Sequence, residues 1–160
     1  CNIDLKSFND GFYRTSCKAR LKPVLETIER IGRSDIWMEV TTLVIPGLND
    51  TREELTDIAR FIAGVDPDIP WHISRFFPSY HSLQTGPTPL EKLREARDIG
   101  LSQGLHHVYL GNVAGESGDV VCPRCLRTVV KRGHGGARVE VHVDRGRCAF
   151  CGRDIGGVFL

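Results

Sequence analysis

No apolar run in this 160-residue sequence approaches the length of a membrane span. No signal peptide is recognisable either, so we expect neither a membrane partner nor secretion. Cysteine pairs without a secretory signal are typical of reduced thiols, which indicates a cytoplasmic location. Methionine occurs only once, at position 38, and the sequence opens on Cys1, so we expect a fragment of a longer protein.

The sequence has almost no net charge, +1 formally, but its charges are unevenly placed. Residues 1–119 carry 13 Lys and Arg against 17 Asp and Glu, whereas residues 120–160 carry eight against three. This shift predicts a boundary between Gly115 and Asp119, with domains at 1–115 and 120–160. Aromatic residues are scarce in the second domain, which has only Phe150 and Phe159. Nucleic acid is therefore an unlikely partner of its basic surface.

Four of the six cysteines are grouped near the end of the chain. Cys122 and Cys125 form one CxxC pair, Cys148 and Cys151 form another, and 22 residues separate the pairs. This spacing is typical of a four-thiolate metal site, because each short turn can aim two sulfurs at one ion. Four thiolates make the tetrahedral shell that Zn²⁺ prefers. Two local disulfides are the alternative.

The last 40 residues have too few large apolar side chains for a self-sufficient core, so a metal is expected to stabilise them. Their strand signals are at 128–130, at 138–144 with valines alternating on one face, and at 155–160, with a glycine-rich turn at 133–136. Two metal-binding turns with a hairpin between them predict a zinc-ribbon-like β domain. His134 and His142 are expected in solvent, because the cysteines already complete the shell.

Strand and helix patterns alternate along the first 115 residues. Strands are predicted at 2–6, 37–45, 71–77 and 107–111; helices are predicted at 18–32, after a capping box at Thr51–Glu54, and from a second box at Thr88–Glu91 to Gln103. Such alternation predicts an α/β fold with a parallel sheet and helices on its outer face.

Polar residues recur with period two in three of these strands. They are Asp4 and Lys6, Glu39 and Thr41, and His72 and Ser74. The opposite faces are apolar and suit the helix layer. Burial of such polar groups is costly unless they pair or bind a ligand. We therefore expect a polar ligand site near the carboxyl ends of the strands, with a buried network of ion pairs, Lys6 with Glu39 or Asp4, as the alternative.

Three segments carry a resemblance to a known family. The runs at 2–8, 39–50 (which ends Pro46-Gly47-Leu48-Asn49-Asp50) and 71–76 resemble radical S-adenosylmethionine (SAM) enzymes of the pyruvate formate-lyase activating-enzyme branch. The run at 109–113, followed by a CxxC ribbon, looks like the AmmeMemoRadiSam-system radical SAM enzyme. The resemblance covers nearly the whole chain and implies a partial (β/α) barrel, here the C-terminal half.

The resemblance also implies an oxidoreductase chemistry and its cofactors. Such enzymes bind SAM on a [4Fe-4S] cluster and cleave it reductively to a 5′-deoxyadenosyl radical. Asp4 would then lie near a cation and SAM, Lys6 would hold the methionine carboxylate, and Glu39 and Thr41 would approach SAM. The position of Thr41 is often Arg in the branch, which is a departure. Tyr80 or His81 could approach the adenine.

The cluster-binding CxxxCxxC motif of the family does not occur in this sequence. We therefore expect its ligands in a missing N-terminal half of the barrel, in the same protein or a partner chain, and no radical activity from this chain alone. The four cysteines could alternatively hold an auxiliary Fe-S cluster. A different class of function is also open, a metal-stabilised binding module whose basic ribbon recognises nucleic acid or a protein. Nothing in the sequence indicates the substrate.

Overall fold

The computed structural model describes residues 1–79, 85–116, 118–132 and 139–157. The chain divides into two compact units, unit 1 at Cys1–Val113 and unit 2 at Ala114–Leu160. Each unit has its own cluster of buried apolar residues.

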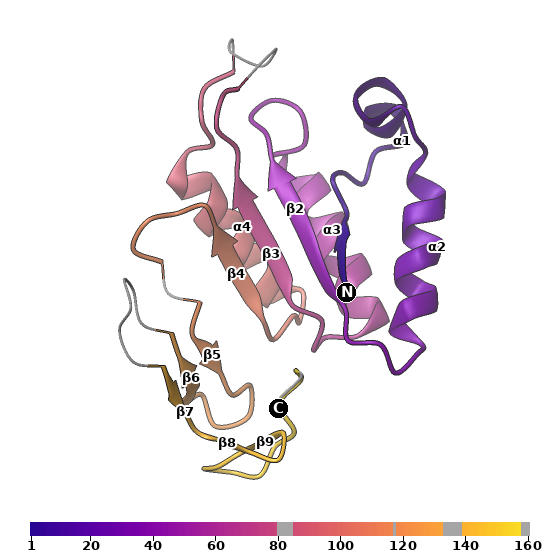
Figure 1. Ribbon diagram of the computed structural model, residues 1–160. Coiled ribbons are helices and arrows are strands. Elements are labelled where there is room, and N and C mark those ends of the chain that lie inside the picture. The colour runs from indigo at the N-terminus through magenta and orange to yellow at the C-terminus, as the bar shows by residue number, and fades with distance from the viewer. Residues whose placement is uncertain (80–84, 117, 133–138, 158–160) are drawn as a thin grey trace. The chain divides into compact units, whose positions relative to one another are not determined.

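Unit 1 contains a parallel sheet whose four strands follow the order β1-β2-β3-β4 (Figure 1). The strands are β1 (Asn2–Asp4), β2 (Glu39–Val44), β3 (Trp71–Arg75) and β4 (Val108–Gly111). The helices are α1 (Asp10–Phe12), the π-helix η1 (Tyr13–Cys17), α2 (Leu21–Gly32), α3 (Arg52–Val65) and α4 (Leu90–Ser102). At least one helix lies in each connection between neighbouring strands. The α/β class with a parallel sheet that the alternation predicted is confirmed.

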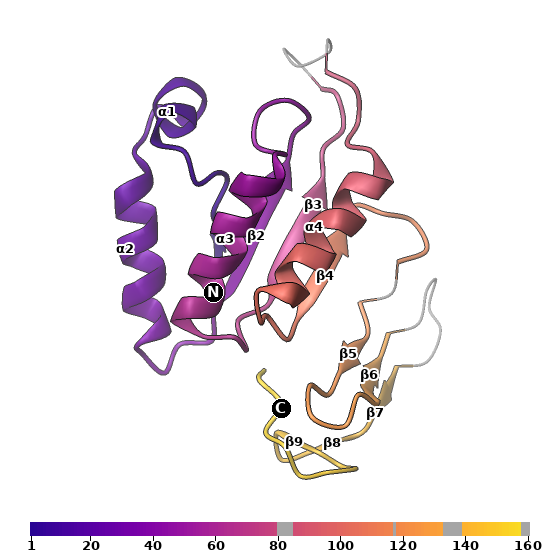
Figure 2. The ribbon, with the colours of Figure 1, turned by 180° about the vertical axis from the view of Figure 1, so that it is seen from behind.

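The helices α3 and α4 cover one face of the sheet, as the view from behind shows (Figure 2). That face supplies Val40, Val44, Trp71 and Ile73, all fully buried. The helices α3 and α4 meet it with their buried apolar side chains, namely Leu55, Ile58, Ala59, Ile62, Leu93, Ala96 and Ile99. Thr42 is a buried polar side chain on this face of β2, and its hydroxyl donates to the Leu5 carbonyl at 2.8 Å and accepts from Trp71 Nε1 at 2.9 Å.

The predicted elements are longer than the observed ones at several ends. The helix expected from residue 18 begins at Leu21, because Lys18 has a left-handed backbone (φ 53°) that ends the preceding π-helix. The strand expected from residue 37 begins at Glu39, and the strand expected to residue 77 ends at Arg75. Side-chain periodicity alone does not locate the exact ends of helices and strands.

Only half of the first predicted capping box forms. The Thr51 side chain caps α3 by accepting from the Glu54 backbone N–H at 3.2 Å. The Glu54 carboxylate instead accepts from the Ser7 hydroxyl and from the Phe8 backbone N–H at 3.0 Å. Glu54 therefore ties α3 to the segment after β1, a contact between residues far apart in sequence.

The second predicted box, at Thr88–Glu91, is wrong. The N-cap of α4 is Pro89, which has no side-chain cap. Thr88 is fully buried, where its hydroxyl donates to the Val44 carbonyl at 2.6 Å and accepts from the Phe76 backbone N–H at 3.0 Å. Thr88 therefore links the ends of β2 and β3 and does not cap α4.

The loop after β2 is organised by one buried amide. Asn49 is fully buried, and its Oδ1 accepts from the Ile45 backbone N–H at 2.7 Å. Its Nδ2 donates to the carbonyls of Lys6 at 2.5 Å and Leu43 at 2.9 Å. Gly47 permits the turn with a φ of 73°. Asn49 thus links the end of β2 to the residues that follow β1.

Unit 2 consists of short antiparallel strands. They are β5 (Val120–Val121), β6 (Thr128–Lys131) and β7 (Glu140–Val141) in one sheet, and β8 (Val143–Asp144) with β9 (Arg147–Cys148) in another. The single strand predicted at 138–144 is therefore wrong, because its described part is split at His142 between two sheets. Val139 and Val141 are 59% and 54% exposed, so the alternating valines do not form a buried face.

Two other predicted segments of unit 2 lie wholly or partly outside the described residues. The turn at 133–136 and the end of the strand at 155–160 lie outside the described residues. From Ile155 to Gly157, the described part of that last segment, no strand is formed. Asp154, just before it, makes only an isolated bridge with Arg147.

We expect Asn49→Ala to lower the free energy of unfolding by about 2–4 kcal/mol, because it leaves buried backbone groups without hydrogen-bond partners. Urea denaturation measures this change. Asn49→Asp should destabilise at least as much, since it keeps the acceptor for Ile45 but sets a buried carboxylate oxygen against the carbonyl oxygens of Lys6 and Leu43. Leu48→Ala, at the 55% exposed neighbour, is the control and should change stability by less than about 1 kcal/mol. Equal effects of Asn49→Ala and Leu48→Ala would contradict the role of Asn49.

Candidate functional site

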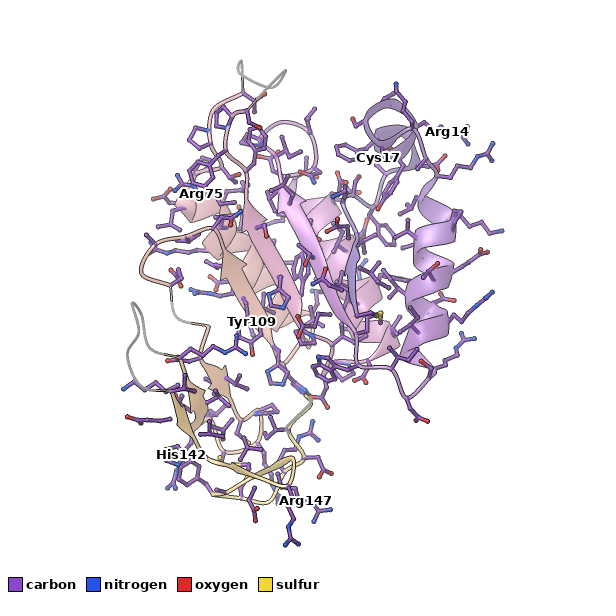
Figure 3. All side chains as sticks on the ribbon, viewed as in Figure 1. Arg14, Cys17, Arg75, Tyr109, His142 and Arg147 are labelled. Carbon is purple, nitrogen blue, oxygen red and sulfur yellow. The ribbon has the colours of Figure 1, made fainter. Side chains whose placement is uncertain are left out.

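The face of the sheet opposite the helices carries polar side chains within the described part of unit 1 (Figure 3). Strand register sets Asp4 beside Thr41, Thr41 beside His72, and His72 beside Tyr109. These four residues form one row across the sheet, on adjacent strands about 4.8 Å apart. Glu39 lies two residues before Thr41 on β2, and Ser74 lies two residues after His72 on β3. Period two therefore places them on the same face.

Lys6 lies two residues beyond the end of β1, and its side chain is on the same face as Asp4. Its Nζ contacts Asp4 Oδ2 at 3.0 Å, with the two side chains 42% and 55% exposed. An exposed pair of this kind adds only about 0–1 kcal/mol to stability. Its main effect is to orient the Lys6 ammonium. The pair is not the buried network that was the alternative expectation. The six predicted residues, Asp4, Lys6, Glu39, Thr41, His72 and Ser74, thus share one accessible face, which we call the polar face.

Glu39 and His72 form a second side-chain contact on the polar face. His72 Nε2 is 2.9 Å from Glu39 Oε2, and Trp37 Nε1 donates to Glu39 Oε1 at 3.2 Å. The Thr41 hydroxyl donates to Asn2 Oδ1 at 3.0 Å. Both carboxylate oxygens of Glu39 therefore have a partner, and the imidazole is held against β2.

Sequence reasoning missed three residues of this face, namely Asn2, Trp37 and Tyr109. The Tyr109 ring is 5.4 Å from that of His72 and lies parallel to that of His107 at 6.4 Å, with 9° between the planes. The same period-two argument, applied to β1 and β4, would have found Asn2 and Tyr109. Trp37 precedes β2, and its contact with Glu39 depends on the conformation of the segment that leads into β2.

The four cysteines of unit 2 come together as the spacing predicted. The sulfurs of Cys122, Cys125, Cys148 and Cys151 lie within 4.8 Å of one another. The shortest separations cross between the pairs, 3.6 Å from Cys122 to Cys151 and 3.7 Å from Cys125 to Cys148. These distances far exceed a disulfide bond of about 2.05 Å, and all four thiols are free. The arrangement is a metal-binding group.

Two turns of the same form hold the sulfurs. In the first, the N–H of Cys122 donates to the Arg127 carbonyl at 2.9 Å; in the second, the N–H of Cys148 donates to the Arg153 carbonyl at 2.8 Å. The residue after each second cysteine has a left-handed backbone, with φ 59° at Leu126 and 72° at Gly152. We call these turns knuckle 1 (122–127) and knuckle 2 (148–153).

The electrostatics of the cluster favour ionisation of one thiol. Burial raises the pKa of Cys122, but hydrogen bonds from the backbone N–H groups of Cys125 and Arg124 outweigh it and lower the pKa to about 7. At Cys151 the Arg153 backbone lowers the pKa, whereas burial and the neighbouring cysteine sulfurs raise it to about 11. A bound cation would deprotonate all four, because the thiolate is the ligand.

Within the described residues, the remaining candidate ligands lie outside this cluster. His142 is exposed and stands against Phe150, with ring centroids 5.1 Å apart. His134, Tyr80 and His81 lie outside the described residues. Cys1 is exposed and Cys17 packs at the edge of the core of unit 1.

No helix of the described chain is both long enough and apolar enough to cross a membrane.

Three comparisons with known proteins bear on this arrangement. No protein-family model matches the chain. An uncharacterized protein of Methanocaldococcus jannaschii is 40% identical over 157 residues, which is 96% of this chain and 47% of that protein. The chain thus spans about half the length of this relative. A crystal structure of a domain of pyruvate-formate lyase-activating enzyme from Bacteroides vulgatus superposes with a TM-score of 0.58 and 24% identity, over 69% of this chain and 66% of that one. The chain therefore shares the fold of that activating-enzyme domain.

Proposed function

We propose that this chain is the SAM-binding C-terminal half of a radical SAM enzyme of the pyruvate formate-lyase activating-enzyme branch, with an appended zinc ribbon. The observation that carries the proposal is the polar face, where three strands and the Asp4–Lys6 pair present charged and polar groups on an otherwise apolar sheet. The motifs that resemble the family supply most residues of this face, and the fold agrees with that of an activating-enzyme domain. AmmeMemoRadiSam-system enzymes are the narrower assignment.

Lys6 is the residue we assign to the methionine carboxylate of SAM. Its ammonium is held at 3.0 Å by Asp4, yet 42% of the side chain is exposed and open to a second anion. Its backbone is fixed through the Asn49 amide at 2.5 Å. A positioned ammonium makes a strong, charge-assisted contact with a carboxylate. Asp4 would also lie near a bound cation.

The other residues of the polar face would line the rest of the SAM site. Glu39, His72 and Ser74 are partly accessible along β2 and β3. Thr41 stands where the branch often has Arg, so its hydroxyl would supply a hydrogen bond in place of a charge. In the intact enzyme, an electron from a reduced [4Fe-4S] cluster would break the sulfur–C5′ bond of SAM and release methionine and the 5′-deoxyadenosyl radical.

The ligands of that cluster would come from a preceding half of the barrel, in the same protein or a partner chain. Within the described residues, β1 pairs only with β2, so its outer edge is available for another parallel strand. The relative of about twice the length is consistent with such a half. This chain alone should have no radical activity.

The four cysteines are proposed to hold one Zn²⁺. Zinc–sulfur bonds of about 2.3 Å in a tetrahedron separate the sulfurs by about 3.8 Å. The observed contacts of 3.6 and 3.7 Å match that value. In a [4Fe-4S] cluster each cysteine binds a different iron, which requires wider sulfur separations. Geometry therefore favours a single ion over an auxiliary cluster, and a structural role over a reactive one.

Anaerobic metal analysis of the purified chain should give about one zinc per chain and no inorganic sulfide. Two to four irons with matching sulfide would replace the zinc assignment with an auxiliary cluster.

Cys122→Ser should release the metal and unfold unit 2, because half of the fully buried residues of its core cluster are cysteines. Amide NMR spectra should lose the dispersed signals of unit 2 and keep those of unit 1. Cys1→Ser, at an exposed cysteine, is the control and should retain both the metal and the spectrum. Full metal content in Cys122→Ser would remove Cys122 from the ligand set.

Lys6→Ala should weaken SAM binding about 10- to 100-fold in a protein that joins this chain to the cluster-bearing half, since a hydrogen bond to a charged group contributes about 1.5–3 kcal/mol. Isothermal titration measures the affinity. Lys22→Ala, at a side chain 83% exposed on α2, is the matched control and should bind normally. Asp4→Asn should impair SAM cleavage. Unchanged affinity in Lys6→Ala would exclude Lys6 from the site.

A further inference from the structure

The two knuckles of unit 2 present a mixed basic and aromatic surface that the SAM chemistry does not use. We call it the knuckle surface and define it by five exposed residues, Arg124, Leu126, Arg127, His142 and Phe150. Leu126 and Phe150 are 77% and 43% exposed. Apolar side chains on a unit this small, next to arginines, indicate a contact surface.

Side chains from three segments meet there. The Arg127 guanidinium of knuckle 1 lies 4.8 Å from the ring centroid of Phe150 in knuckle 2. The His142 ring, from the break between β7 and β8, is 5.1 Å from the same ring. Arg124 reaches across from knuckle 1 to the Cys151 carbonyl, at 3.5 Å. Phe150 therefore contacts both Arg127 and His142, and Arg124 links the two metal-binding turns.

The charge of this segment remains positive after the metal site is included. Residues 120–160 have eight Lys and Arg against three Asp and Glu, a net charge of +5. Four thiolates and one Zn²⁺ together carry a charge of −2, which reduces the net charge to +3. Asp154 is paired with Arg147 at 3.1 Å. Figure 3 shows Arg147 and His142 pointing to different sides of the unit.

Seven of the eight basic residues are arginines. A guanidinium binds phosphate through two donors at once and also stacks on flat rings. Exposed rings beside such groups form platforms on which unstacked bases can lie. The scarcity of aromatics in the sequence argued against nucleic acid, but folding brings His142 and Arg127 to Phe150 and assembles the platform that one phenylalanine could not provide.

We propose that the knuckle surface binds single-stranded nucleic acid, with Arg124 and Arg127 on phosphates and Phe150 and His142 against bases. The proposal concerns unit 2 and does not depend on SAM binding by unit 1. An acidic protein segment is the competing partner, and it would use the charge without the rings.

Fluorescence anisotropy with the zinc-loaded chain and labelled single-stranded RNA and DNA of mixed sequence tests this proposal. Affinity should fall as salt rises. A plot of the logarithm of the association constant against the logarithm of the salt concentration should have a slope of about −1.4 or steeper, because each of two phosphate contacts contributes about −0.7. Arg124→Gln and Arg127→Gln should each reduce that slope by about 0.7. Phe150→Ala should weaken binding about 5- to 150-fold with little change in slope, since stacking contributes about 1–3 kcal/mol per base.

Arg147→Gln removes the same charge away from the knuckle surface and is the matched control. It should leave both affinity and slope nearly unchanged. Zinc content confirms that each variant is folded, and amide NMR shifts of the unmodified chain should locate the oligonucleotide at Phe150 and His142.

Four outcomes would overturn the proposal. They are no binding at low salt, a loss of affinity in Arg147→Gln equal to that in Arg124→Gln or Arg127→Gln, equal affinity for duplex and single strands, and competition by polyglutamate as effective as that by unlabelled oligonucleotide. The last result would assign the surface to an acidic protein segment instead.

Discussion

Burial of one face of the parallel sheet under α3 and α4 is the constraint on which the rest of unit 1 depends. Val40, Trp71 and Ile73 must leave water, and successive side chains of a strand point to opposite faces. The residues between them are therefore directed to the other face, whatever their polarity. Asp4, Thr41 and His72 come into one row for this reason, without needing favourable contacts of their own.

Polar side chains beyond the strand ends complete this arrangement. Asn49, Glu54 and Thr88 each connect segments that are distant in sequence, and each satisfies backbone groups that the short strands leave free. The carboxyl ends of β1, β2 and β3 are thereby held in register. Lys6 lies at this edge, and its backbone is held there by the buried Asn49 amide.

Unit 2 follows a different physical logic. Among its described residues, the buried cluster consists of Cys122, Val129, Cys148 and Ile155, which is too little apolar surface to offset the entropy of ordering the chain. The proposed metal would supply the missing free energy, because the four sulfurs would then share one ion. The same knuckles orient Arg127 and Phe150, so the stabilising site and the proposed recognition surface are parts of one structure.

Local patterns in the sequence were sufficient for the alternation of strands and helices, the apolar faces and the four-cysteine group, because each depends on side-chain period or on short spacing. They failed at Glu54 and Thr88, which resemble capping residues but bond to distant backbone, and at residues 138–144, whose alternation is divided between two sheets. They also missed Tyr109 beside His72 and Arg127 over Phe150. In unit 1, the sequence by itself determined which strand side chains share a face; only the tertiary structure decided which of them meet, because strand register and turn geometry join residues that no local pattern relates.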